Sequence, residues 1–251
     1  MASQGVLRLN LRSQKLVVDE CGYNRWQVVT AERAVSARRT AIIICDMWDN
    51  HWSRAAVARE AALVPRMDEV VKAARARGVK IIHAPSETME FYAEHPARKR
   101  MLAIPQVEPP ADLPHDDPPL PVDDSDGGSD TGEASWHTAW TRQHPGIEIA
   151  DEDVISDDGR EVYSFLRHAG VEQALIMGVH TGMCILGRSF AIKQMARWGV
   201  SIALVRDLTD ALYNPARSPY VSHEEGMELI IGYIEKFWCP TIESGELRGK
   251  R

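Results

Sequence analysis

The sequence lacks the long hydrophobic runs and paired cysteines that mark membrane and disulfide-rich proteins. Its longest near-apolar run, Ala41–Cys45, is far shorter than the roughly 20 residues that a transmembrane helix needs. The N-terminal segment interleaves Leu with Arg and Asn, so we expect no signal peptide. Four cysteines, Cys21, Cys45, Cys184 and Cys239, lie far apart with no CxxC pair, which is typical of free thiols. We therefore expect a cytoplasmic protein without a membrane partner.

Positive charge is missing from one long segment. Between Gln106 and Trp136 there are nine acidic residues and no Lys or Arg. The net charge of the whole chain is −7, so the other residues together carry +2 and form no basic stripe. This distribution argues against a nucleic-acid partner. No GxGxxG or phosphate-loop pattern is present either, and we expect no organic cofactor.

The acidic segment is also rich in turn-forming residues. Seven of the 14 prolines lie between Pro105 and Pro121, and the run DDSDGGSDTGE follows. We expect residues 107–135 to be a solvated, mobile insertion with little regular structure. A calcium-binding loop is the alternative, but Asp124, Asp126 and Asp130 are not followed by a glutamate at the position that a twelve-residue calcium loop requires.

The rest of the chain alternates short β-rich runs with longer helical patterns. This alternation predicts an α/β fold, a doubly wound three-layer sandwich with a mainly parallel sheet, over residues 40–240. Residues 1–39 are expected to form an N-terminal β extension, and residues 241–251 a C-terminal tail. The predicted strands are 40–46, 79–84, 153–156, 171–179 and 200–205. The predicted helices run from Pro65 to before Gly78 and over 159–169, 182–198 and 224–238.

Two strand ends carry reactive residues. Asp46 follows the buried run IIIC directly, and Cys184 lies in GVHTGMC, where a strand turns into a helix. In the first turn of a helix, free N–H groups and the helix dipole lower the pKa of a thiol and can bind an oxyanion. A carboxylate at a neighbouring strand end can take the thiol proton and pass it to a leaving amine. A buried structural cysteine and a turn aspartate are the alternative interpretation.

Three segments resemble the isochorismatase-like cysteine hydrolase superfamily, which includes nicotinamidases, N-carbamoylsarcosine amidases, biuret and ureidoacrylate hydrolases, and isochorismatases. They are IIICDMWDNHW, VKIIHAP and LIMGVHTGMCILGRSFAIKQMARWGVSIALVRDLTDA. The resemblance extends from Thr40 to about Trp238 and omits the extension and the insertion. It implies a six-stranded parallel sheet with helices on both faces, a small-molecule substrate and a homo-oligomer.

The resemblance also implies roles for particular residues. Cys184 would be the nucleophile and Asp46 the proton shuttle. A cis peptide bond would join Val179 to His180, and the backbone N–H groups of His180 and Cys184 would bind the oxyanion. The superfamily's catalytic lysine has no counterpart here, because the third predicted strand, after which it would stand, reads EDVISDD.

In a catalytic protein we expect another cation to replace the lysine. No lysine occurs between Lys99 and Lys193, and Lys193 lies too far along the predicted helix. We expect Arg142, just before the third predicted strand, to supply the positive charge; Arg160 and Lys99 are weaker candidates. An arginine can stabilise negative charge, but it cannot donate a proton near neutral pH.

Trp48, Trp52 and His83 are the residues expected to line the substrate pocket. Both tryptophans follow Asp46 closely, and packing against a neighbouring helix or subunit is the alternative for them. Nicotinamidase-like members bind a metal, but Asp49 and His51 lie earlier in the chain than those members' ligands. We expect no metal here.

The sequence therefore favours a cysteine-dependent hydrolase of a small amide, ureide or carbamoyl compound, acting on a C–N bond other than a peptide bond through a covalent acyl-enzyme. Two alternatives stay open. The first is a binding or scaffold protein on the same fold, which the missing lysine suggests. The second is isochorismatase-type vinyl-ether hydrolysis, against which the presence of Cys184 argues.

Overall fold

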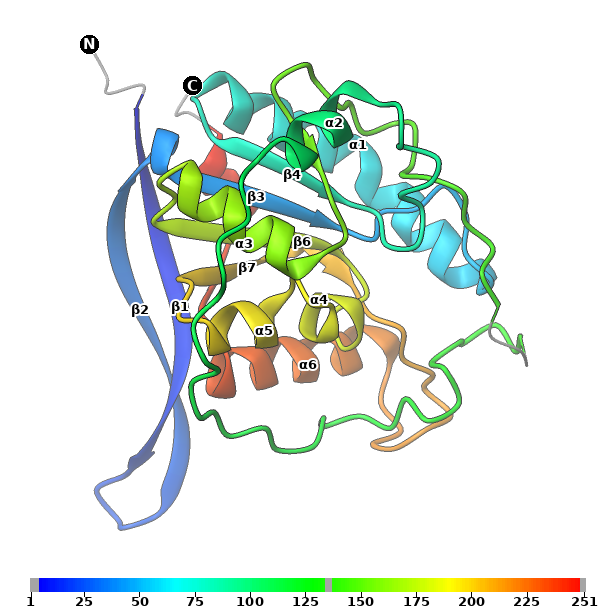
Figure 1. The fold of residues 1–251 in the computed structure, drawn as a ribbon. Coiled ribbons are helices and arrows are strands. Elements are labelled where there is room, and N and C mark those ends of the chain that lie inside the picture. The colour runs from blue at the N-terminus through cyan, green and yellow to red at the C-terminus, as the bar shows by residue number, and fades with distance from the viewer. Residues whose placement is uncertain (1–4, 134–136, 249–251) are drawn as a thin grey trace.

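One mixed sheet organises the molecule (Figure 1). A computed structural model describes residues 5–133 and 137–248, so the last two residues of the predicted insertion and the last three of the predicted tail lie outside it. The strand order is β2-β1-β8-β7-β6-β3-β4-β5. The strands are β1 (Val6–Val18), β2 (Asn24–Ser36), β3 (Thr40–Cys45), β4 (Lys80–Ala84), β5 (Val154–Ile155), β6 (Gln173–Val179), β7 (Ile202–Asp210) and β8 (Thr241–Ile242).

Helices cover both faces of this sheet, as the doubly wound fold requires. They are α1 (Arg54–Ala76), α2 (Pro96–Leu102), α3 (Gly159–His168), α4 (Cys184–Gly187), α5 (Ile192–Arg197) and α6 (His223–Phe237), with short 3-10 helices η1 (Ala37–Arg39) and η2 (Ser244–Leu247). In β3, Ile42 and Ile44 face the α1 layer, whereas Ile43 and Cys45 face the layer that contains α3 to α6. The predicted fold class is confirmed.

The six strands β8-β7-β6-β3-β4-β5 are parallel, and the sixth of them comes from the predicted tail. Thr241 and Ile242 form β8, which pairs with β7 on one side and meets β1 at Arg12 on the other. The tail prediction is therefore wrong for these residues. A strand of two residues gives too short a pattern to recognise, but pairing it covers the backbone groups at the edge of β7.

The N-terminal extension is a long antiparallel hairpin, β1 and β2, at one side of the molecule (Figure 1). Its first half is anchored because Leu7 and Leu9 are fully buried against the α1 layer. The alternation of leucine with polar residues therefore predicted the strand and its buried face correctly. The far end of the hairpin is exposed, at Val18 in β1 and at Tyr23 in the connection between the two strands.

Two predicted helices have different bounds in the structure, and both differences affect the site. Helix α1 begins at Arg54, after the N-cap Ser53, and Pro65 lies inside it rather than at its start. The predicted helix 182–198 is broken into α4 and α5, because Arg188 has an extended backbone with φ −62° and ψ 152°. The earlier start at Arg54 adds an N-terminal half to α1. The break at Arg188 changes the direction of the chain just after Cys184.

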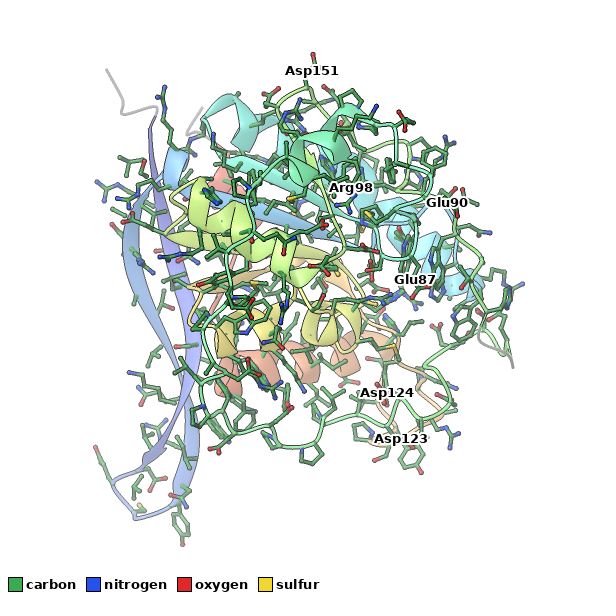
Figure 2. All side chains as sticks on the ribbon, in the orientation of Figure 1. Glu87, Glu90, Arg98, Asp123, Asp124 and Asp151 are labelled. Carbon is green, nitrogen blue, oxygen red and sulfur yellow. The ribbon has the colours of Figure 1, made fainter. Side chains whose placement is uncertain are left out.

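The acidic insertion has no helix or strand over its described residues 107–133. Its acidic groups are not simply solvated, however. Asp117 pairs with Lys193 and Arg197, and Asp130 pairs with Arg59. The insertion is therefore fastened to α1 and α5 by ion pairs, which corrects the expectation of a solvated linker. Asp123 and Asp124, labelled in Figure 2, lie between these two ion-paired residues in the sequence.

None of the helices in the described part of the chain is both long enough and apolar enough to cross a membrane.

Candidate active site

Two parallel strands bring the predicted catalytic segments together. Strands β3 and β6 are neighbours in register, with Cys45 opposite Gly178, so both chains leave the sheet at the same edge. Gly178 has φ +120°, and a Cβ atom there would lie 2.0 Å from the Cys45 carbonyl oxygen. Only glycine allows this approach. The backbone contact places Asp46 beside the turn that follows β6.

Asp46 is fully buried and held from two sides. It has φ +48°, an uncommon conformation for a residue with a side chain. Its Oδ1 accepts a hydrogen bond from the Ser86 N–H at 2.7 Å, and its Oδ2 accepts one from the Arg188 Nε at 2.9 Å. Burial raises the pKa of Asp46, and the Arg188 guanidinium opposes that rise. The carboxylate is therefore a fixed base with a cation on one oxygen.

The half-buried Cys184 is hydrogen-bonded to Asp46 through its thiol. Burial raises the pKa of the Cys184 thiol above its ordinary value, and the Asp46 carboxylate raises it further, whereas Arg188 and the His180 N–H act in the opposite direction. This direction differs from the expected lowering of the thiol pKa, because burial and the adjacent carboxylate outweigh Arg188 and the His180 N–H. In the resting site the sulfur keeps its proton.

The turn between β6 and α4 carries backbone donors near the sulfur. The peptide bond between Val179 and His180 is cis, and the His180 N–H contacts the Cys184 sulfur. The N–H groups of Met183 and Ile185 both donate to the His180 carbonyl oxygen. Over residues 5–133 and 137–248, the Cys184 N–H has no acceptor. The His180 N–H therefore points toward the thiol.

The cation beside the pair is Arg188, not Arg142. Arg142 is half-exposed; its guanidinium lies 3.8 Å from Asp49 and over the ring of Phe91. Its backbone, rather than its side chain, joins the site region, because its carbonyl oxygen accepts from the Asp49 N–H. The weaker candidates are also engaged elsewhere, Arg160 with Glu108 and Lys99 with Glu94.

Sequence reasoning missed Arg188 although its signal was present. Arg188 stands four residues after Cys184, the spacing that puts two side chains on one face of a helix. The search for a replacement cation followed the position of the family lysine instead. A second carboxylate, Glu87, lies 3.2 Å from the Arg188 Nη1 and is labelled in Figure 2. Arg188 is thus held between Asp46 and Glu87.

Aromatic side chains pack beside the thiol. Trp48 and Trp140 stack at 4.0 Å with an interplanar angle of 11°, and Cys184 packs against their cluster. The His51 ring is nearly parallel to Trp140 at 5.6 Å and meets His180 edge-on at 4.9 Å. Burial lowers the pKa of His51 to about 4 and that of His180 well below its ordinary value. Both imidazoles are therefore neutral near pH 7.

The predicted pocket residues have different surroundings. Trp48 is buried, and its Nε1 donates to the Ser86 carbonyl oxygen at 3.1 Å. Trp52 lines a cavity of about 490 Å³ whose other walls come mainly from the acidic insertion, including Asp126 and Glu133. His83 is fully buried and does not line this cavity, in contrast to its predicted place in the pocket. Both of its ring nitrogens are occupied, by Gln143 and by Asp153.

No group of three or more His, Cys, Asp or Glu side chains in the described segments is arranged to hold a metal ion. Asp49 instead accepts hydrogen bonds from the Thr141 N–H and hydroxyl. His51 accepts one from the Ser53 N–H on Nδ1, so the neutral ring carries its proton on Nε2.

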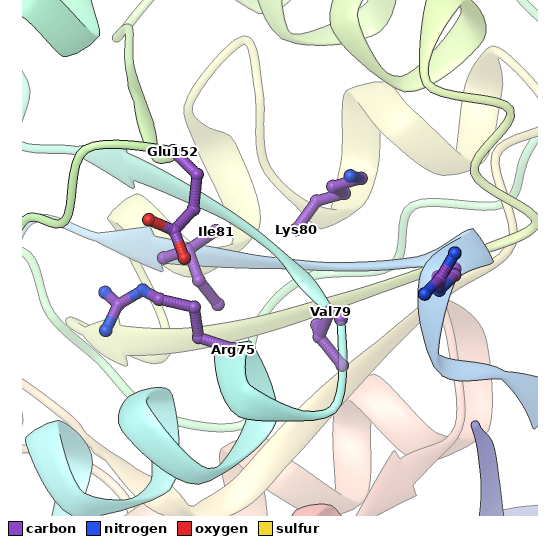
Figure 3. Close-up of a pocket in the computed structure, with 7 residues that line it drawn as sticks. Arg75, Val79, Lys80, Ile81 and Glu152 are labelled. Atoms are coloured by element: carbon purple, nitrogen blue, oxygen red, sulfur yellow. The ribbon is translucent and has the colours of Figure 1, made fainter. Parts of the chain in front are cut away.

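Another cavity, of about 290 Å³, lies at the amino-terminal end of the parallel strands, opposite the end that carries Asp46 (Figure 3). It is lined by Arg75, Lys80 and Glu152, among others, where β4 begins. Because the strands are parallel, this position is remote from Asp46, which follows the end of β3. Arg75 is already paired with the buried Asp153.

The fold is similar to that of a solved hydrolase. A cysteine hydrolase from Pseudomonas syringae pv. phaseolicola 1448A superposes with a TM-score of 0.53 and 15% identity, covering 85% of this chain and 92% of that one. An isochorismatase family protein from Burkholderia thailandensis gives a TM-score of 0.48 and 14% identity over 83% and 93% of the two chains. No protein-family model and no curated protein sequence matches this chain. The structure therefore shares its fold with the solved cysteine hydrolase from Pseudomonas syringae.

Proposed function

We propose that this protein is a cysteine-dependent hydrolase that cleaves a C–N bond in a small amide, ureide or carbamoyl compound. The observation that carries the proposal is the chain of contacts from the Cys184 thiol to Asp46 and from Asp46 to Arg188. This arrangement joins a nucleophile, a base and a fixed cation in a largely buried site. Such a combination is typical of covalent acyl transfer.

In the first half of the proposed reaction, the Cys184 sulfur attacks the substrate carbonyl carbon while Asp46 takes the thiol proton. The negative charge that develops on the carbonyl oxygen is stabilised by the N–H groups of His180 and Cys184. Asp46 then gives its proton to the leaving nitrogen. The C–N bond breaks, ammonia or an amine departs, and a thioester to Cys184 is left.

In the second half, water attacks the thioester carbonyl carbon and Asp46 takes a proton from that water. The C–S bond breaks, the acid product leaves, and the sulfur recovers the proton from Asp46. Arg188 keeps its proton throughout, because a guanidinium cannot be deprotonated near neutral pH. Every proton transfer therefore passes through Asp46, and Arg188 contributes only charge and position.

Arg188 also removes the main reason for the scaffold alternative, which was the missing family lysine. Isochorismatase-type chemistry is disfavoured because that reaction does not use a cysteine nucleophile. The expected homo-oligomer and the cytoplasmic location stay predictions.

The experiment is a screen of small amides and ureides for ammonia release, with Cys184→Ala and the matched control Cys21→Ala. Cys21 is an exposed free thiol in the hairpin connection. We expect Cys184→Ala to lose activity by at least about 10³-fold and Cys21→Ala to retain it. Mass spectrometry of the quenched wild-type reaction should show an acyl adduct on Cys184. Activity that survives Cys184→Ala unchanged contradicts the covalent mechanism.

A further inference from the structure

A buried carboxyl group behind the catalytic turn has no role in the steps above. Glu60 is 2% exposed and lies on the core-facing stripe of α1, in line with Ala56 and Val64. Glutamate is almost never fully buried without a partner. Sequence reasoning passed over Glu60 because it began the helix at Pro65.

Three acidic groups act on Glu60. Asp46 from the end of β3, Asp49 from the following loop and Asp210 from the end of β7 all act on it. Its neighbour Arg59 is committed to Asp130 and Asp210. Among the described residues Glu60 forms no ion pair, and its Oε1 has no hydrogen-bond partner.

One backbone contact links Glu60 to the site. The Trp48 N–H lies within hydrogen-bonding reach of the Glu60 carboxyl group, and the same N–H donates to the Asp46 carbonyl oxygen at 2.9 Å. The turn from Asp46 to Trp48 orients both the base and the aromatic wall. Glu60 therefore contacts the turn in which Asp46 has its positive φ.

We propose that Glu60 is a positioning residue for the Asp46–Cys184 pair, and that it must be an uncharged acid to perform this role. This inference rests on the proposed function. A charged Glu60 would favour transfer of the shared proton onto Asp46, and the base would then be lost. An uncharged Glu60 supports the turn without this repulsion.

The pKa of the Glu60 carboxyl group agrees with its buried position. Burial, together with the negative charges of Asp46 and Asp49, raises the pKa of Glu60 to about 9. Glu60 therefore holds its proton through the neutral range and ionises above it. Once ionised, it places a new negative charge near Asp46 and Cys184, which raises the pKa of the Cys184 thiol further and makes the thiolate scarcer.

The test needs no substrate. Alkylation of Cys184 by iodoacetamide is followed by mass spectrometry between pH 7 and pH 10.5 in the wild type and in Glu60→Gln, which is isosteric and cannot ionise. We expect similar rates at pH 7, and Glu60→Gln faster by about three- to tenfold above pH 9.5, the ratio that a pKa difference of half to one unit produces. A ratio that is the same at every pH overturns the proposal.

Two further variants separate positioning from electrostatics. Glu60→Leu removes both the charge and the acceptor for the Trp48 N–H, so Cys184 should react at a different rate from Glu60→Gln at pH 7; equal rates overturn the positioning role. Glu69→Gln makes the same chemical change at an exposed position on α1 and should follow the wild type at every pH.

Failure of this inference can be told apart from failure of the proposed function. If Glu60 has no pH-dependent effect but Cys184→Ala still abolishes hydrolysis, only the role of Glu60 is wrong. If amide hydrolysis does not require Cys184, the proposed function is wrong whatever the alkylation shows.

Discussion

Arg188 Nε donates to Asp46 Oδ2 at 2.9 Å, although the two residues are 142 positions apart in the sequence. The contact joins the end of β3 to the break between α4 and α5. It puts a permanent positive charge beside a buried carboxylate, which offsets part of the cost of burying that charge. A cation is thus present at the carboxylate, although the sequence has no lysine between Lys99 and Lys193.

Replacing Arg188 with Met should lower hydrolysis and the alkylation rate of Cys184 by about 10²-fold, because Asp46 and the developing oxyanion lose their cation. Arg188→Lys should recover part of this loss, since a lysine supplies charge without the fork of donors. The matched control is Arg142→Met, which we expect to behave as the wild type. If Arg142→Met were the damaging variant, the assignment of the cation would be wrong.

Asp46→Asn should lower kcat by about 10²- to 10⁴-fold, because an amide cannot accept the thiol proton. The folded state should not suffer in the same way. Burial raises the pKa of Asp46, so its ionised form is costly in the folded protein. Urea unfolding at pH 7 should therefore show Asp46→Asn to be at least as stable as the wild type. A large loss of stability would point to a structural role instead.

Glu60→Gln should stabilise the protein increasingly as the pH rises from 5 to 8. Between the ordinary glutamate pKa and about 9, folded Glu60 is protonated while unfolded Glu60 is ionised, so wild-type stability falls with pH. One such group contributes about 1.4 kcal/mol per pH unit. The measurement is the difference in free energy of unfolding between the two proteins, with Glu69→Gln as the reference for a surface change. A difference that does not vary with pH would exclude a raised Glu60 pKa.

Arg75→Met should destabilise the fold by about 3 kcal/mol, because it removes one partner of a buried ion pair. The Arg75 and Asp153 side chains are 9% and 1% exposed and lie 2.6 Å apart, and Asp153 also holds His83. Arg142→Met, at a half-exposed arginine, should change stability by no more than about 0.5 kcal/mol. Equal effects in urea unfolding would contradict the difference in burial.

Asp130→Asn should loosen the acidic insertion, because it breaks the ion pair with Arg59. Limited digestion by proteinase K should cleave residues 107–133 about two- to fivefold faster than in the wild type, as expected when a partly exposed pair is lost. Asp116→Asn is the control, since the Asp116 side chain is exposed. Identical cleavage in both variants would favour a solvated insertion.

Much of the architecture could be predicted because strand patterns are local. The run TAIIIC is apolar on both faces, so it had to be a central strand. The short strands were harder, since two residues such as Thr241 and Ile242 carry no period. The break at Arg188 was marked only weakly: Gly187, just before it, is a poor helix former, but the apolar pattern of a helix continues on both sides.

The sequence by itself determined the parallel sheet and the two segments that meet at the carboxyl ends of its strands. Hydrophobic periodicity and strand ends are local patterns, so residues close together in the sequence are enough to reveal them. Only the tertiary structure decided which cation reaches Asp46, which histidine has both ring nitrogens hydrogen-bonded, and which glutamate is buried with no ion pair to the residues described. Those facts depend on distances between residues far apart in the chain, and such distances are set by packing and by where a helix begins or breaks.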